Sequence, residues 1–162
     1  MDFDFFWKTY EESFPADERR SREQQISLSE VENYAIQEIR SDDDIVGFIT
    51  YWEFEMFTFV EHFALAESAR GKGSGSDYLS QFLKTCDKPI VLEVEPPIED
   101  LQKRRVIFYE RLGFHLTPYT HVQTPFVQGR NGVLLQLMTY PNAISDTEFE
   151  EIETVLFSTV YH

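Results

Sequence analysis

The feature that most constrains this chain is a glycine-rich loop at residues 70–76, between a candidate strand and a candidate helix. Every second residue from Gly71 to Gly75 is glycine, which allows positive φ angles and leaves no Cβ between a ligand and the backbone. Where such a loop opens a helix, backbone N–H groups point outward and the helix dipole favours an anion. Arg70 and Lys72 add positive charge. The pattern therefore predicts a phosphate-binding loop.

Two widespread phosphate-loop patterns do not fit this segment. The P-loop pattern fails because no glycine lies at the required upstream spacing from Lys72, and Gly73 stands where Ser or Thr is needed. The dinucleotide-binding pattern fails because Ser76 stands where a third glycine is needed. The pattern that fits is Arg-x-x-Gly-x-Gly, which reads Arg70-Gly71-Lys72-Gly73-Ser74-Gly75.

The remaining sequence alternates helical and strand patterns. Helices are predicted at residues 3–14, 16–32, from the glycine loop to about 86, 100–112 and 145–160. Strands are predicted at residues 34–40, 45–54, 57–66, 89–95, 114–122 and 132–140. The strand at 89–95 has few polar positions, so we expect it to be central and buried on both faces. This order predicts an α/β (α+β) domain of three layers, without a clear strand before the first helix.

Composition limits the partners of the chain. A length of 162 residues fits a single domain over residues 1–162. The net charge of −15 argues against nucleic acid or an anionic membrane surface as the main partner, and it favours cationic small molecules. The acidic start and the lack of a long apolar run lead us to expect a cytoplasmic protein. The single cysteine, Cys86, excludes an internal disulfide and is expected to pack in the core.

A second motif gives the loop a more specific meaning. It reads Phe108-Tyr109-Glu110-Arg111-Leu112-Gly113-Phe114 and ends a predicted helix. The glycine loop and this motif, with one strand between them, closely resemble the GNAT family of N-acetyltransferases. The resemblance covers roughly residues 34–141. It implies a GNAT-like fold, with a central mixed, mostly antiparallel sheet flanked by helices, and acetyl-CoA as the co-substrate.

The resemblance also implies roles for single residues. In the family, the backbone of the strand before the loop pairs with the pantetheine arm, which corresponds to Phe63, Ala64 and Leu65. The loop holds the pyrophosphate, which makes cofactor-binding candidates of Arg70, Gly71, Lys72, Gly73, Ser74, Gly75 and Ser76. The tyrosine of the second motif, here Tyr109, lies near the CoA sulfur and protonates the leaving thiolate. A phenol, with a pKa of about 10, is a suitable donor to a thiolate of similar basicity.

The second helix departs from the family pattern, which often has Asn and Ala where this chain has Gln102 and Arg105. Because both residues share a helical face with Tyr109, we expect Arg105 to point toward the cofactor or toward the acceptor. We count Arg105 among the cofactor-binding candidates. A solvated helix face is the alternative for this basic side chain.

A base is required because an amine is protonated at neutral pH and cannot attack a thioester. The family takes its base from the strand before the loop or from the central strand, which corresponds to Glu61 and Glu93. Glu95 shares a strand face with Glu93 and is the reserve candidate, and the alternative of neither glutamate stays open. Since His62 alternates with Glu61, only one of the two is expected to face the cleft.

No metal site is predicted. His115, His121 and His162 have no partner at zinc-ligand spacing, and the pattern HExxH is absent. The run Asp42–Asp44 is expected to be the solvated tip of a hairpin.

We therefore expect an acetyl-CoA-dependent N-acetyltransferase that acts on a small, cationic primary amine by direct attack in a ternary complex. The long loop Gln123–Asn131 favours a small acceptor because it can cover one. Two alternatives stay open: an acyl-CoA-binding regulatory module with little turnover, and a peptide or protein N-acetyltransferase. A homodimer is a further open alternative.

Overall fold

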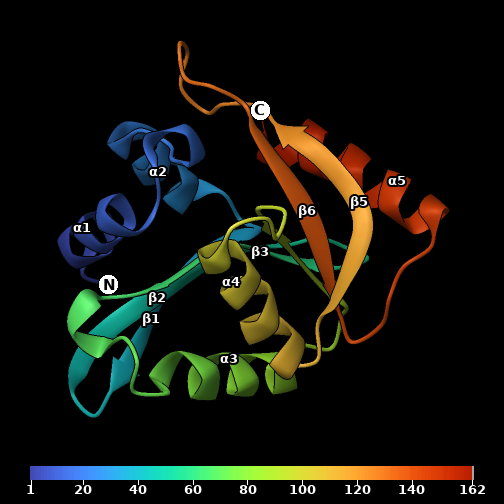
Figure 1. The fold of residues 1–162 in the computed structure, drawn as a ribbon. Helices are drawn as coiled ribbons and strands as arrows, with labels where there is room; N and C mark the ends of the chain where they lie inside the picture. The colour runs from blue at the N-terminus through green and yellow to red at the C-terminus, as the bar shows by residue number, and fades with distance from the viewer. Residues whose placement is uncertain (162) are drawn as a thin grey trace.

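Six strands form one mixed sheet in the computed structural model, which describes residues 1–161 (Figure 1). The strands are β1 (Tyr34–Ser41), β2 (Asp44–Glu53), β3 (Thr58–Leu65), β4 (Ile90–Val94), β5 (His115–Gln123) and β6 (Val133–Tyr140). The helices are α1 (Phe3–Ser13), α2 (Arg22–Ser27), α3 (Ser74–Thr85), α4 (Asp100–Arg111) and α5 (Asp146–Val155). Short helical turns are η1 (Ala16–Glu18), η2 (Leu28–Glu30), η3 (Glu67–Ala69) and the π-helical η4 (Leu156–Val160).

The strand order is β1-β2-β3-β4-β6-β5. Only β3 and β4 run parallel, because α3 crosses over between them, and all other neighbours are antiparallel. The predicted central strand is confirmed, since Val91 and Leu92 of β4 point to opposite faces and both are buried. The two hairpins, β1–β2 and β5–β6, confirm the expected mostly antiparallel pairing.

Helices cover both faces of the sheet, which confirms the three-layer fold (Figure 1). On one face, α3 and α4 place Leu79 and Val106 against the sheet. On the other, α5 and η4 place Ile152 and Leu156 against it, while α1 packs Phe6 on β2 and β3. No helix among residues 1–161 is both long enough and apolar enough to span a bilayer.

The predicted helix at residues 16–32 is wrong. This segment divides into η1, α2 and η2, with Arg19 in an extended conformation after η1. Ser21 caps α2, because its hydroxyl accepts from the Gln24 N–H while the Gln24 side chain accepts from the Ser21 N–H. The backbone N–H of Arg20 donates to the Tyr10 hydroxyl at 2.9 Å, outside any helix. Tertiary hydrogen bonds thus override the weak helical pattern.

A β-bulge at Glu61 changes which side chains of β3 face the cavity. In the pairing with β2, Tyr51 lies opposite Val60 and Thr50 lies opposite His62, so Glu61 is the extra residue. The alternation expected from the sequence is therefore interrupted. As a result, Glu61 and His62 both line the same cavity, and the expectation that only one of them would face it is wrong.

Candidate functional site

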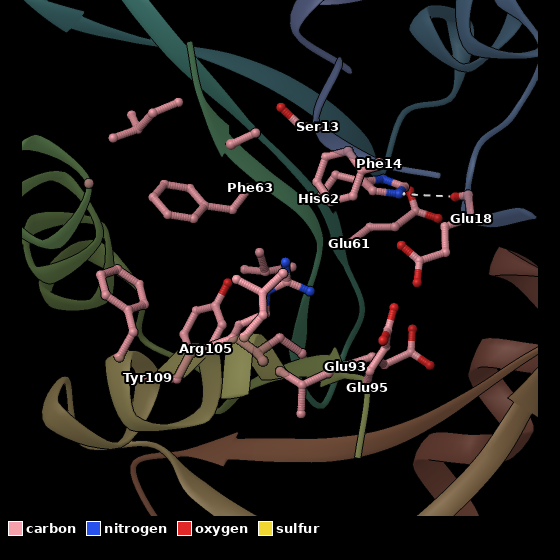
Figure 2. Close-up of a pocket in the computed structure, with 18 of the residues that line it drawn as sticks. Ser13, Phe14, Glu18, Glu61, His62, Phe63, Glu93, Glu95, Arg105 and Tyr109 are labelled. Carbon is pink, nitrogen blue, oxygen red and sulfur yellow. Dashed lines mark hydrogen bonds and ion pairs between the residues drawn. The ribbon is translucent and has the colours of Figure 1, made fainter. Parts of the chain in front are cut away.

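A cavity of about 830 Å³ opens where β3 and β4 separate (Figure 2). The two strands pair only from Thr58 to Val60 of β3 and from Ile90 to Leu92 of β4. Beyond these residues, the edge of β3 that faces β4 and the edge of β4 that faces β3 have no neighbouring strand. The cavity is also lined by the glycine loop, α4, η1 and the β5–β6 loop. It therefore lies where the sequence places the expected ligand.

The glycine loop has the conformation that an anion site requires. Gly71 and Gly73 have φ angles of +76° and +80°, and a Cβ at either position would meet no atom within 4 Å. Gly73 is the N-cap of α3 and provides no side-chain cap, so the first N–H groups of the helix are left for a ligand. Gly75 does not use the positive φ that glycine allows. This residue is helical, and a Cβ there would lie 3.2 Å from Leu65 Cδ1 of β3.

Most of the expected cofactor residues meet at this cavity. Those that line it are Phe63, Ala64, Leu65, Arg70, Gly71, Gly73, Gly75, Ser76 and Arg105. Lys72 and Ser74 are not among the lining residues. Arg70 is held at the cavity wall, because its Nε donates to the Leu65 carbonyl at 3.1 Å. The uncapped helix, the bare glycines and Arg70 together fit a diphosphate group.

Tyr109 extends from α4 toward the cavity, near Phe63 (Figure 2). It is 9% exposed, and its ring packs edge-on against Phe108 and Phe114. Burial raises the pKa of Tyr109 to about 12, although the nearby Arg105 charge acts in the opposite direction. The phenol is therefore a proton donor throughout the neutral range.

Glu61 lies in a buried ion pair with Arg20, with the two side chains 4% and 6% exposed. The Arg20 Nη1 is 2.7 Å from the carboxylate, and Trp52 Nε1 donates to it at 3.3 Å. Burial alone would raise the Glu61 pKa, but the Arg20 charge, with His62 and the two donors, holds it below its usual value. Glu61 is thus an ionised carboxylate whose charge is neutralised by Arg20.

His62 is neutral at pH 7. Burial lowers its pKa to about 4, despite the opposing effect of the adjacent Glu61 carboxylate. Its Nε2 lies 3.3 Å from the Glu18 carbonyl, which can only accept, so Nε2 carries the proton.

Glu93 is held by two donors, one from β5 and one from the residue that follows η4. His121 Nε2 and the Tyr161 hydroxyl both donate to its carboxylate. Burial and the Glu93 charge raise the pKa of Tyr161 well above its usual value, which keeps this donor protonated. Sequence reasoning linked neither partner to Glu93, because both come from segments remote in the chain.

Glu18 is a cavity residue that sequence reasoning missed. It is the last residue of η1, and it points toward Glu93 and Glu95 across the cavity (Figure 2). Burial, together with the neighbouring Glu95 carboxylate, raises the pKa of Glu18 to about 7, while Arg105 acts to lower it. We call Glu18, Glu93 and Glu95 the acidic end of the cavity; in Figure 2 they lie on the side away from α3.

The β5–β6 loop holds the acidic end in place. Arg130 Nη1 donates to the carbonyls of Ala16 and Arg19, at 2.8 Å each. The Asn131 N–H donates to the Asp17 carboxylate at 3.0 Å. These bonds hold η1, and therefore Glu18, against the β5–β6 loop, which is the loop expected to cover a small acceptor.

Within residues 1–161, no group of three or more His, Cys, Asp and Glu side chains is placed to hold a metal ion. His115 is exposed on β5, and His162 lies outside the described residues. Asp42 and Asp43 form the predicted hairpin tip between β1 and β2.

Comparison with known proteins is consistent with this geometry. The model of the Acetyltransferase (GNAT) family matches residues 3–114 of the chain. The Bacillus subtilis (strain 168) protein YjbC, described as an acetyltransferase, is 32% identical over 111 residues, which are 67% of this chain. The chain matches 56% of the length of that relative.

Two solved structures extend the comparison. A protein from Bacteroides thetaiotaomicron, described as an acetyltransferase of the GNAT family, is 36% identical and has a TM-score of 0.93. That match covers 98% of this chain and 91% of the other. A GNAT acetyltransferase from Elizabethkingia anophelis, solved with acetyl-CoA bound, is 16% identical with a TM-score of 0.54, over 74% and 82% of the two chains.

Proposed function

Since the chain belongs to the GNAT acetyltransferase family, as its two motifs predict, we propose that it transfers an acetyl group from acetyl-CoA to a small, cationic primary amine. The observation that carries this proposal is the cavity itself. An uncapped glycine loop lies at one end of it and three carboxylates lie at the other. One end suits a diphosphate, and the other suits an ammonium group.

The cofactor end is supported by three features of the chain. Beyond Glu61, β3 has no strand on its β4 side, so its backbone around Phe63 is available to an extended pantetheine arm, while the Leu65 carbonyl accepts from Arg70. The first amides of α3 are available to the pyrophosphate. Arg105 and Arg70 add positive charge to the lining.

The acceptor end is supported by its charge. Arg20 neutralises Glu61, but Glu18, Glu93 and Glu95 have no paired Lys or Arg within ion-pair distance among the described residues. Arg105 is the basic side chain that opposes them, by lowering the pKa of Glu18. The net charge of −15 acts in the same direction over longer distances.

Acetyl-CoA supplies an activated thioester carbonyl to this site. The amine nitrogen forms the new C–N bond directly, the C–S bond breaks, and no covalent enzyme intermediate is needed. Tyr109 donates its proton to the departing sulfur and recovers one from the amine nitrogen. Glu61 and Glu93 remain proposals for the base, although the Arg20 ion pair makes Glu61 the weaker proton acceptor.

The test is a thiol-release screen of small amines with acetyl-CoA, accompanied by calorimetry of acetyl-CoA binding. We expect micromolar to millimolar binding and turnover with at least one cationic amine. Binding without turnover on any amine or peptide would support a regulatory module instead. Turnover on peptides alone would support a protein N-acetyltransferase. The absence of binding at millimolar acetyl-CoA would overturn the proposal.

A further inference from the structure

Glu18 and Glu95 face each other from segments 77 positions apart in the chain. Glu18 ends η1, between α1 and α2, whereas Glu95 directly follows β4. Figure 2 shows the two side chains converging on the space between β3 and β4. Both line the cavity, in which Tyr109 lies on the opposite wall beside Arg105.

The Glu95 carboxylate is held by a side-chain hydrogen bond, whereas Glu18 is held through its backbone. Gln102 Nε2 donates to Glu95 Oε2 at 2.6 Å, and the same side chain accepts from the Glu99 N–H at 2.9 Å. Glu18 is fixed through its backbone, because its carbonyl accepts from His62 and the neighbouring carbonyls accept from Arg130. Two carboxylates held this close cannot both ionise without repulsion.

Burial, and after it the neighbouring Glu95 carboxylate, raises the pKa of Glu18 to about 7. The Glu93 charge contributes in the same direction. Arg105 of α4 opposes them. From β3, the Glu61 charge is balanced by Arg20 and His62 is neutral, so this element adds little net charge.

The other two carboxylates of the cavity are less suited to accept a proton. Glu61 is paired with Arg20, and its pKa is lowered. Glu93 already accepts two hydrogen bonds, from His121 and Tyr161, whereas Glu95 accepts one, from Gln102. A base with a pKa close to the working pH is the most effective, which favours the remaining pair.

We propose that Glu18 and Glu95 together bind the ammonium group of the acceptor and remove its proton. This inference rests on the proposed acetyl transfer and identifies the residues that start it. The ionised pair takes one proton from R–NH₃⁺ and leaves R–NH₂, which attacks the thioester carbon. After the attack, Tyr109 gives its proton to the departing sulfur and takes the second proton from the nitrogen. The Glu18–Glu95 pair later releases the first proton to solvent.

The first test compares the pH dependence of kcat/KM in the wild type, Glu18→Gln and Glu95→Gln. The wild type should lose activity below pH 7, as the pair becomes protonated. Glu18→Gln should lower kcat/KM by about 10²- to 10⁴-fold, the usual scale of acid–base catalysis, and abolish this acidic limb. Glu95→Gln should move the limb to lower pH, because the repulsion that raises the Glu18 pKa is removed.

The second test does not depend on activity. Carbon-13 NMR of the side-chain carboxyl groups in the protein without ligands should show one glutamate that titrates near pH 7. That titration should disappear in Glu18→Gln and move to lower pH in Glu95→Gln. Glu151→Gln, an exposed position on α5, makes the same change in charge and should leave both profiles unchanged.

The outcomes separate this inference from the proposed function. If no amine is acetylated but the NMR titration behaves as expected, the proposed function fails and the proton-holding pair stands. If amines are acetylated and both variants keep the wild-type acidic limb, the pair is not the base. Loss of that limb in Glu93→Gln alone would also overturn the inference, in favour of Glu93.

Discussion

Arg20 neutralises the carboxylate of Glu61, which lines the cavity. Its guanidinium binds Glu61, donates to the Val160 carbonyl at 3.0 Å, and lies 3.9 Å above the Phe126 ring. These contacts join the segment between η1 and α2 to β3, η4 and the β5–β6 loop through one side chain. The charge of Arg20 is therefore satisfied on several sides, and Glu61 depends on it for compensation.

Replacing Arg20 with Met should strongly destabilise the fold. The variant leaves the Glu61 carboxylate buried without its cation, which costs about 3–5 kcal/mol in the free energy of unfolding. Urea denaturation measures this change directly. The matched control is Arg22→Met, which breaks a pair with Asp4 whose side chains are 45% and 92% exposed. That loss should be about 0–1 kcal/mol, and similar costs for both variants would contradict the buried-pair argument.

Replacing Tyr109 with Phe should affect turnover and spare binding. Removing the phenolic proton donor should reduce kcat by about 10²- to 10⁴-fold, since the thiolate then leaves without assistance. The buried ring stays in contact with Phe108 and Phe114, so the acetyl-CoA dissociation constant should change little. Steady-state kinetics and calorimetry measure the two quantities. Unchanged kcat would exclude Tyr109 as the acid.

At the scale of the elements, the glycine loop and the start of α3 form the cofactor end. Gly73→Ala should weaken acetyl-CoA binding, because its Cβ would stand at the uncapped end of α3 and would strain a φ of +80°. Gly129→Ala is the matched control, since Gly129 has a φ of +89°, equally open surroundings and a place outside the cavity lining.

Both variants should lose similar stability in urea, and only Gly73→Ala should raise the dissociation constant in calorimetry. Equal affinities would show that the cofactor does not approach the backbone at Gly73.

The elements that depend on local sequence were the ones predicted correctly. The glycine loop, the strand before it and the helix that the second motif ends follow from periodicity and turn chemistry. Gly113, just after α4, has the positive φ typical of a glycine that follows a helix. All six strands were found to within about two residues, an ordinary boundary error. These features need no information from distant parts of the chain.

The errors lie where tertiary contacts decide the conformation. The bulge at Glu61 arises from how β3 matches β2, which alternation within β3 cannot reveal. Glu18 reaches the cavity because Arg130 and His62 hold η1 there. One local signal was missed: the capping box from Ser21 to Gln24 marks a helix that starts after residue 21 and ends the predicted helix at 16–32.

At the scale of the whole molecule, two groups of the cavity lining, His62 and Glu18, give stability opposite dependences on pH. The folded pKa of His62, about 4, lies below its ordinary value of 6.5, so its contribution is lost as the pH falls from 6.5 toward 4. The folded pKa of Glu18, about 7, lies above its ordinary value of 4.5, so its contribution is lost as the pH rises from 4.5 toward 7.

The Glu18→Gln variant should therefore show a steeper loss of stability in acid than the wild type. Between pH 6.5 and 4.5 the His62 effect then acts without the opposing Glu18 effect. Urea denaturation at pH 4.5, 5.5 and 6.5 gives the two slopes. A wild-type slope equal to or steeper than that of the variant would contradict the opposite signs.

The acidic end of the cavity and the net charge of −15 act together on the acceptor. The most direct measurement is kcat/KM for 1,4-diaminobutane, butylamine and 4-aminobutanoate at low and high salt. The diamine should be fastest and the amino acid slowest at low salt. This difference should shrink with added salt, because charges separated by more than about 8 Å are screened at physiological ionic strength. Faster turnover of 4-aminobutanoate at low salt would contradict a site built for cationic amines.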